Sequence, residues 1–464
     1  MSSKSMPQQD AVASTRLYRA VWRWHFYAGL YVIPFLLMLA ITGFFMMLFT
    51  TYLPEHGDRL AVTPQAQALP VGSVAEAARA SFGAEAKVSD MRTPYDARTP
   101  MMVTVAAGEV NHVLAVDPYT GTVLHSMPQD STWNLFLEKI HGTLLLGQTG
   151  DWLIEIAASL GIILAVTGVY LWWPRGTGFG AALVPKFSAS GRSLWKSWHE
   201  TTGAWMAIIL VFFMVTGLAW ASVWGERFTQ SWSTFPAEKW DNVPLSDKTH
   251  LSLNGTGEKQ VPWGLEQTPL PVSGSMAGVT ILPSGTPIDL TGMVQIGRAL
   301  GIEGRMRVTP PDGETGVWTI SQNSMSYDGA SPTLDRTVHV DQYTGKVLAD
   351  VRYADYGLAA KAMAVGIALH EGQLGWWNFV INAVFCLAVV FLCISGVVMW
   401  WKRRPVGQFG SPKYPRNYTV PAGALGLGAV LAVAFPLGGL AIALFAIIDF
   451  LLPKGLKEAG VQNS

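Results

Sequence analysis

The sequence predicts a membrane protein: an α-helical bundle of five transmembrane helices, built from an internal duplication, with two α+β inserts outside the membrane. Half of the 464 residues are apolar and only 14% are charged, a composition typical of chains that cross a bilayer several times. Five apolar stretches each reach the ~20 residues needed to cross a hydrocarbon core. The third observation is that the chain repeats itself.

The repeat is seen as two series of motifs with matching spacing. The first series is Trp24-His25, Gly29, Thr42-Gly43, Val116–Gly121, His141 and Trp172-Trp173. The second series is Trp198-His199, Gly203, Thr216-Gly217, Val340–Gly345, His370 and Trp400-Trp401. In both, the glycine follows the first histidine by four residues, and Thr-Gly follows it by seventeen and eighteen. Such a series indicates two copies of one structural unit.

The five predicted spans are residues 24–50, 152–173, 199–224, 376–401 and 420–452. The first follows Arg16, Arg19 and Arg23 and is too long for a cleavable signal, so it is predicted to be a retained anchor. Basic residues also cluster between the second and third spans and after the fourth. All these segments fall on the cytoplasmic side if the N-terminus is cytoplasmic.

This topology divides the chain into six parts. They are the N-terminal tail with the first span (residues 1–53), a first insert (54–150), the second and third spans with their loop (151–224), a second insert (225–368), the fourth span (369–404), and a loop, the fifth span and the C-terminal tail (405–464). Both inserts then lie outside, and the cytoplasmic loops are too short for a nucleotide-binding domain.

Charge and cysteine content exclude several classes of function. The formal net charge is zero, so no overall field favours nucleic acid. The two cysteines, Cys386 and Cys393, lie in the fourth predicted span and are expected to pack as apolar side chains. No Cys-x-x-Cys-His motif is present, which excludes that route to covalently attached haem.

Each insert is predicted to fold as a helix packed on a small antiparallel sheet. Alternating apolar residues and a Tyr-Thr-Gly turn indicate this fold. The expected helices are residues 73–82 and 290–300, and the expected strands are 86–91, 101–106, 111–116 and 121–125, then 304–309, 316–321, 336–341 and 345–351. Asp117 and Asp341 precede the two turns and are expected to accept hydrogen bonds from turn amides. Residues 225–285, rich in Pro, Gly and Ser, are expected to be irregular.

The repeated Val-Asp-x-Tyr-Thr-Gly turn, set between spans that end in Trp-Trp and basic residues, resembles the PepSY-associated transmembrane family. That family includes bacterial inner-membrane proteins of iron uptake and haem-containing siderophore reductases. The resemblance covers roughly residues 15–405 and leaves the fifth span outside. It implies the bacterial inner membrane as the location, with the two PepSY-like inserts in the periplasm.

Four of the nine histidines occupy positions related by the duplication, which indicates paired cofactor ligands. His25 and His199 begin their spans at the cytoplasmic edge, and His141 and His370 precede theirs at the outer edge. We expect two noncovalent haem b groups with two histidine ligands each, one per leaflet. If another histidine replaces an outer ligand, the candidates are His112, His125 and His339, whose default role is strand polarity.

Small residues share the helix faces of these histidines. Gly29 and Gly203 lie about one turn deeper than His25 and His199, and are predicted to give the porphyrin room. Gly43 and Gly217 lie five turns from the same histidines, about 27 Å along the helix, and are predicted to line an outer cavity. Thr167-Gly168 and Ser395-Gly396 supply two further notches near the inner pair. The alternative for all these glycines is close helix–helix packing.

Two haems stacked across a membrane imply electron transfer between its faces. Their electrons are expected from a cytoplasmic reductase or from the quinol pool, because the chain has no flavin or nicotinamide motif. The resemblance implies a ferric siderophore or another ferric chelate as acceptor, reduced so that ferrous iron is released. The alternatives are a cofactor-free binding or regulatory protein and an iron or haem transporter.

Charged and polar residues of the inserts and spans are expected to have structural roles. Arg305, Arg307 and Arg336 are expected on a solvated face, with attraction of an anionic chelate as the alternative. Glu155 and Asn382 lie within spans and are expected to hydrogen-bond inside the bundle, with a proton-coupled role as the alternative.

Overall fold

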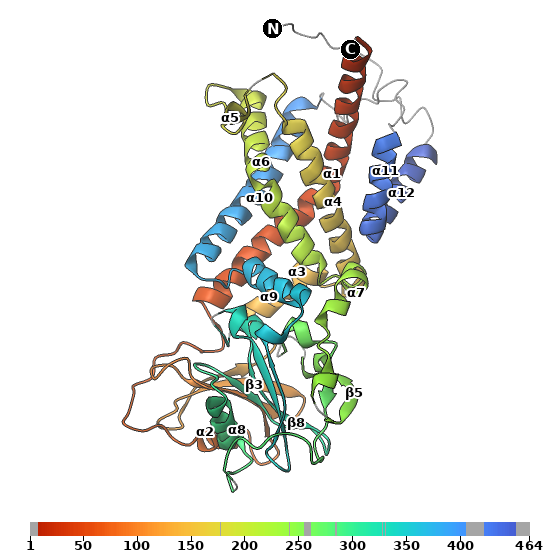
Figure 1. Cartoon of the computed structure of the whole chain (residues 1–464). Helices are drawn as coiled ribbons and strands as arrows, with labels where there is room; N and C mark the ends of the chain where they lie inside the picture. The colour runs from red at the N-terminus through yellow and green to blue at the C-terminus, as the bar shows by residue number, and fades with distance from the viewer. Residues whose placement is uncertain are drawn as a thin grey trace. The chain divides into compact units, whose positions relative to one another are not determined.

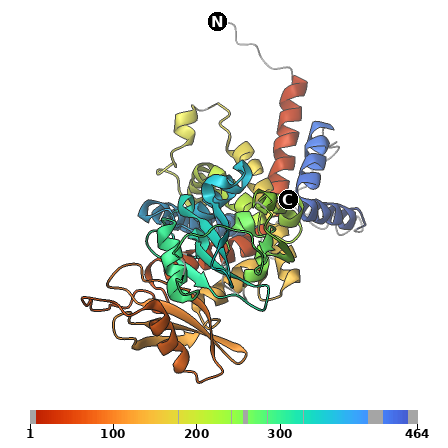
Figure 2. The same ribbon diagram turned by 60° about the horizontal axis from the view of Figure 1, so that its bottom comes forward.

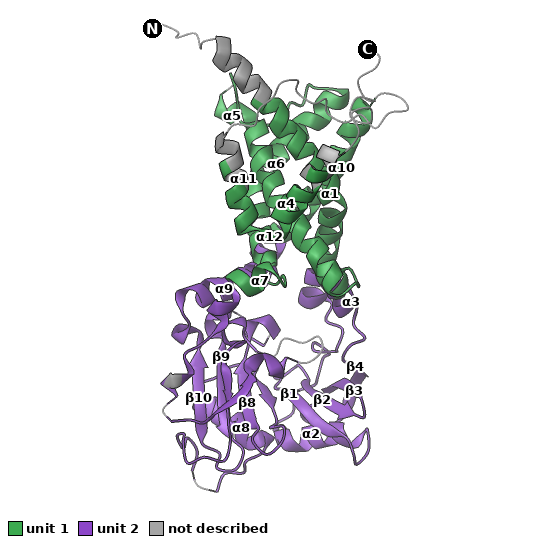
Figure 3. Ribbon diagram, turned by 90° about the vertical axis from the view of Figure 1, so that its right-hand side faces the viewer, with its two compact units in different colours: residues 1–44, 139–228, 381–464 green, residues 45–138, 229–380 purple. Residues whose placement is uncertain are grey.

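The computed structural model describes residues 8–404, apart from short gaps at 177, 241, 255–260, 284, 327 and 330, together with residues 422–451. The chain divides into two compact units (Figure 3). Unit 1 contains residues 1–44, 139–228 and 381–464, and unit 2 contains residues 45–138 and 229–380.

Four long helices dominate unit 1 (Figure 1). They are α1 (Gln8–Tyr52), α4 (Gln148–Trp172), α6 (Gly191–Leu218) and α10 (Trp376–Arg403). Each contains an apolar stretch long enough to cross a membrane. Four of the five predicted spans are therefore found as single helices.

The packing of this bundle is that of a membrane protein. Val32 of α1, Leu218 of α6 and Val389 of α10 are buried where the helices meet. Outward-facing side chains are equally apolar, as Ile208 and Leu387 are 84% and 65% exposed. A continuous apolar outer surface on long helices requires lipid around it.

The fifth predicted span, residues 420–452, is not found as one helix. Within the described residues 422–451 it forms α11 (Ala422–Ala434) and α12 (Pro436–Leu451), which Figures 1 and 2 draw as separate helices. The break falls at Phe435, because Pro436 has no amide hydrogen and its ring disfavours helix in the preceding residue. At about 20 and 24 Å, both helices are shorter than a ~30 Å hydrocarbon core.

Short helices precede α4 and α10, and each carries one of the two outer histidines. Helix α3 (Trp133–Thr143) carries His141 and is separated from α4 by a turn in which Leu144, Leu145 and Gly147 have positive φ. Helix α9 (Leu358–His370) ends at His370, and residues 371–375 break the chain before α10. Two other short helices complete the set, α5 (Phe179–Ala182) and α7 (Trp224–Phe228).

Unit 2 is built on one antiparallel sheet with the strand order β10-β9-β8-β7-β1-β2-β3-β4 (Figure 3). Its strands are β1 (Lys87–Arg92), β2 (Met101–Ala107), β3 (Val110–Val116), β4 (Val123–Pro128), β7 (Arg307–Thr309), β8 (Val317–Gln322), β9 (Arg336–Asp341) and β10 (Val347–Arg352). All eight predicted strands are present. Two meanders of four strands therefore meet through β1 and β7.

One face of this sheet is covered by two helices, α2 (Val71–Ala80) and α8 (Leu290–Ala299). Val74 of α2 and Met293 of α8 are buried against strand residues such as Val103 and Val338. Each helix precedes its own four strands in the chain. The same order of one helix and four strands thus occurs twice, as the sequence predicts.

The segment between α7 and α8 is largely irregular, as predicted. It holds the two-stranded sheet of β5 (Leu245–Thr249) and β6 (Pro269–Pro271). Single turns of 3-10 helix occur here and later in unit 2: η1 (Gln230–Ser233), η2 (Ala237–Lys239), η3 (His250–Leu253), η4 (Trp263–Leu265), η5 (Ser324–Ser326), η6 (Pro332–Leu334) and η7 (Tyr353–Asp355).

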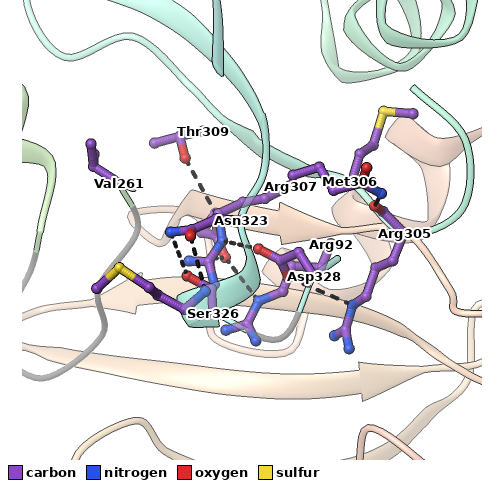
Figure 4. Close-up of polar contacts among 12 residues, drawn as sticks. Arg92, Val261, Arg305, Met306, Arg307, Thr309, Asn323, Ser326 and Asp328 are labelled. Carbon is purple, nitrogen blue, oxygen red and sulfur yellow. Dashed lines mark hydrogen bonds and ion pairs between the residues drawn. The ribbon is translucent and has the colours of Figure 1, made fainter. Parts of the chain in front are cut away.

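Arginines that the sequence places on a solvated face are buried instead. Arg305 and Arg307 are 3% and 1% exposed, and Arg336 is 9% exposed and bound to Asp350. Arg307 lies beside Arg92 in the β1–β7 pairing, and its Nε is 3.3 Å from Oδ2 of Asp328 (Figure 4). The prediction was wrong because the folded sheet buries these residues, Arg307 in the central strand β7 and Arg336 in β9, and buried guanidinium groups need carboxylate partners.

The two aspartates before the Tyr-Thr-Gly turns act on turn amides, as predicted. Asp117 accepts from the amide of Tyr119 at 2.8 Å. Asp341 is buried and accepts from the amides of Tyr343, Thr344 and Gly274 at 2.9, 2.8 and 2.6 Å. Burial alone would raise the pKa of Asp341, but these amides outweigh it and lower the pKa.

The substitution Asp341→Ala is expected to destabilise unit 2 by about 2–3 kcal/mol, because it leaves buried amides without an acceptor. Asp117→Ala is the matched control and should cost about 1 kcal/mol, since Asp117 is half-buried and holds fewer amides. Thermal unfolding of the full chain in detergent at pH 7.5 measures both. Equal shifts in Tm for the two variants would contradict this account.

Candidate functional site

His25 of α1 is held by a hydroxyl group on α4. Its Nδ1 lies 3.0 Å from Oγ1 of Thr167. That hydroxyl donates its own hydrogen to the carbonyl of Ile163, at 2.7 Å. Its oxygen must therefore accept from His25, which places the imidazole hydrogen on Nδ1 and leaves Nε2 with a lone pair.

His199 of α6 repeats this arrangement against α10. Its Nδ1 lies 2.7 Å from Oγ of Ser395, and that hydroxyl bonds the carbonyl of Leu392 at 3.1 Å. The same reasoning puts the ring hydrogen of His199 on Nδ1 and leaves Nε2 unprotonated, with a lone pair. Each ring in this pair is thus oriented by a hydroxyl on the neighbouring helix.

His141 is held in the same way by α1. Its Nδ1 lies 2.8 Å from Oγ1 of Thr42, which bonds the carbonyl of Met38 at 2.8 Å. Burial lowers the pKa of His141 to about 4, so the ring is neutral at pH 7. A neutral ring with hydrogen on Nδ1 presents Nε2 as a ligand.

The fourth motif is Thr216-Gly217 on α6. Thr216 bonds the carbonyl of Phe212 at 2.8 Å, as Thr42 bonds that of Met38. Its duplicate-related histidine, His370, is the last residue of α9 and belongs to unit 2. The pairing of His141 with His370 therefore stays a prediction.

The glycine after each hydroxyl residue makes room for the ring. A Cβ on Gly168 would lie 3.1 Å from Cε1 of His25, and one on Gly43 would lie 3.3 Å from Cε1 of His141. A Cβ on Gly396 would lie 3.8 Å from Cε1 of His199. A larger residue at Gly168 or Gly43 would thus push its imidazole away.

Gly29 and Gly203 have different surroundings. A Cβ at either would meet a leucine methyl at 3.7 Å, from Leu164 and Leu392 respectively. That is an ordinary contact, so neither position needs glycine for helix packing alone. Their predicted role beside a porphyrin stays a prediction.

The part of the site that sequence reasoning missed is the set of three hydroxyl groups of Thr42, Thr167 and Ser395. The signal was available, because Thr or Ser precedes the glycine in all four motifs.

His25 and His199 have matching surroundings. Both lie in unit 1 and both present an unprotonated Nε2. Among the described residues, no group of three or more His, Cys, Asp or Glu side chains is arranged to hold a metal ion. Each of these two rings could therefore offer one nitrogen to a metal complex.

The three alternative histidines lie on strands of unit 2. His339 is buried in β9, and its Nε2 lies 2.8 Å from Nε2 of His250. Nδ1 of His250 donates to the carbonyl of Thr268 at 2.7 Å, so Nε2 of His250 accepts from Nε2 of His339. Nδ1 of His339 is bonded to Oγ1 of Thr319 at 3.1 Å, so neither ring offers a spare lone pair. His112 of β3 packs on the ring of Phe82, with centroids 4.5 Å apart. His125 lies on β4, half-buried beside Gly57.

Comparison with known proteins gives one family match. The model of the family described as the PepSY-associated TM region matches residues 22–403. This range contains all four duplicate-related histidines and both meanders of the sheet. No curated protein matches the chain.

The hydroxyl bonds predict an uncommon tautomer. In the full chain, labelled with ¹⁵N-histidine and purified without added ligand, His25 should carry its ring hydrogen on Nδ1 at pH 7.5. Thr167→Ser should keep this tautomer, whereas Thr167→Val should release the ring to the Nε2-protonated form that is common in solution. The ¹⁵N chemical shifts of the ring report the result. An Nε2–H signal for His25 in the unsubstituted chain would refute the hydrogen-bond assignment.

The glycine contacts predict unequal effects of one added methyl group. Gly168→Ala should displace the His25 ring, because its Cβ would lie 3.1 Å from Cε1. Gly29→Ala is the control in the same region, because its Cβ would lie 3.7 Å from Cδ1 of Leu164, an ordinary contact. The ¹⁵N shifts of His25 should change in the first variant only. Unchanged shifts in Gly168→Ala would show that the ring is not confined there.

Proposed function

The chain belongs to the PepSY-associated transmembrane family, and from this premise we propose that it is a di-haem electron-transfer protein of the bacterial inner membrane. One observation carries the proposal. Three of four duplicate-related histidines are fixed by a hydroxyl on Nδ1 so that Nε2 is left for a metal. A hydrogen bond to the ring nitrogen that does not bind the metal commonly orients a metal-binding histidine.

In this proposal His25 and His199 hold one haem b, and His141 and His370 hold the other. Haem supplies an iron that takes up and releases one electron. With two imidazole ligands each, the haems would exchange electrons instead of binding oxygen. The protein's contribution is to fix the ring orientation through the hydroxyls, and to surround the cofactor with apolar helix faces that keep water out.

We infer that the bundle and the sheet both derive from one duplication. The four spans and two groups of one helix and four strands support this, with the strand groups as PepSY-like inserts. Clustered Arg and Lys at span ends favour a cytoplasmic N-terminus, which puts both inserts in the periplasm. The α11–α12 pair lies after the duplicated part.

The proposed reaction moves electrons outward. A cytoplasmic reductase or a membrane quinol supplies them, and a ferric siderophore or another ferric chelate in the periplasm accepts them. Each ferric ion takes one electron and becomes ferrous, and the chelate then releases it. The substrate class rests on the family, whereas the direction rests on the topology.

Replacing His25 or His199 with Ala is expected to lower the haem content from two to about one per chain, because each removes one ligand of the same haem. His112→Ala is the control and should keep two. Haem is measured as the pyridine haemochrome against protein concentration. The reduced wild-type spectrum should also return to the oxidised form on adding ferrioxamine. If both single variants keep two haems, these histidines are not the ligands.

A further inference from the structure

Two features of unit 1 differ between the two halves of the chain. The first is a pair of acids, where the other half has the buried amides Asn378 and Asn382 one residue away. The residue twelve before Thr167 is Glu155, whereas the residue twelve before Ser395 is Ala383. Sixteen residues before the same positions stand Asp151 and Phe379. The second feature is the α11–α12 pair, which follows the last repeated motif. The symmetric haem sites explain neither feature.

These two departures from symmetry meet at one place. The indole Nε1 of Trp224 donates to the carbonyl of Ala434 at 2.8 Å, at the end of α11. Its ring stacks on Phe435, with centroids 6.3 Å apart and planes 11° from parallel. A Cβ at Gly438 would lie 2.6 Å from Cβ of Ser159, so only glycine lets α12 approach α4 here.

Glu155 lies one helical turn from Ser159, whose hydroxyl donates to the Glu155 carbonyl at 2.8 Å. The Glu155 side chain is 1% exposed. Its Oε2 accepts from the amides of Val223 and Trp224 at 3.1 and 3.3 Å. Its Oε1 has no hydrogen-bond partner among the described residues. A buried acceptor inside a span is costly unless something donates to it.

Asp151 connects this carboxyl to the end of the helix. It lies one turn before Glu155 on α4 and is half-buried. Ser222 binds Asp151 through both its amide, at 3.1 Å, and its hydroxyl. The two acids therefore form a short series from a buried position towards the start of α4.

We propose that the place where Glu155 meets the α11–α12 break binds a membrane quinol and takes electrons from it. This rests on the proposed function. A quinol is an apolar ring compound with hydroxyl donors, which suits a buried carboxylate whose Oε1 has no partner and whose Oε2 is held by the amide of Trp224. A water-soluble reductase would not require a carboxylate buried in a span.

The chemistry balances as follows. A quinol O–H bond breaks, and its proton binds Oε1 of Glu155 and passes through Asp151 to water. The second hydroxyl proton leaves by the same route. The quinol is oxidised to quinone, and its two electrons reduce two ferric irons of the proposed haems to ferrous.

The test uses the full chain in nanodiscs, mixed with decylubiquinol in a stopped-flow spectrometer. Wild type should be reduced, and Glu155→Gln should react roughly 100-fold more slowly, the usual loss for a missing general base. Asp151→Asn should slow the reaction less. Glu226→Gln, an exposed acid on α7, is the matched control and should react as wild type.

Dithionite separates the possible failures, because it reduces haem without the quinol site. Glu155→Gln should keep wild-type haem content and dithionite reduction. If Glu155→Gln does not fold, Gly438→Ala replaces it, since the added Cβ displaces α12 without touching a carboxyl, and it should also slow decylubiquinol. The quinol site would be overturned if either variant reacted with decylubiquinol at the wild-type rate. It would also be overturned if dithionite reduced the wild type and decylubiquinol did not. Both results would leave the di-haem proposal standing. A chain without haem would overturn both.

Discussion

A hydroxyl that donates to a carbonyl of its own helix has only its oxygen left for a facing histidine. That constraint fixes the tautomer of His25, His199 and His141, and through it the direction in which each can bind a metal. It also needs two helices at close approach, which the following glycine permits at Gly168 and Gly43. The bundle, the short helix before α4 and the notches all serve this one interaction.

The proposed duplication would account for most of the remaining architecture. Each half supplies two spans to the bundle and one group of a helix and four strands to the sheet. The halves of the sheet join through β1 and β7, where arginines of both halves are neutralised by Asp90 and Asp328. Where the symmetry fails, at Glu155 and the α11–α12 pair, a function that acts once per molecule is the natural explanation. Entry of electrons from one donor is such a function.

Much of this could be predicted from sequence, because the signals are periodic. Four spans, two insert helices and eight strands follow from apolar runs and alternation, and the role of Asp341 follows from turn chemistry. The failures have a common cause. Arg305 and Arg307 were expected in solvent because local sequence does not show that β7 pairs with β1 at the centre of a sheet. The hydroxyls were missed because their partners are far away in sequence, as with Thr167 and His25.

The central claim is that pairs of imidazoles, oriented through Nδ1, hold iron porphyrins. The electron paramagnetic resonance spectrum of the purified, oxidised wild-type chain tests it directly, since low-spin ferric signals with two imidazole ligands differ from every high-spin or five-coordinate form. The account predicts low-spin bis-imidazole signals that integrate to two irons per chain. A colourless protein without such signals, or one with only high-spin iron, would contradict it.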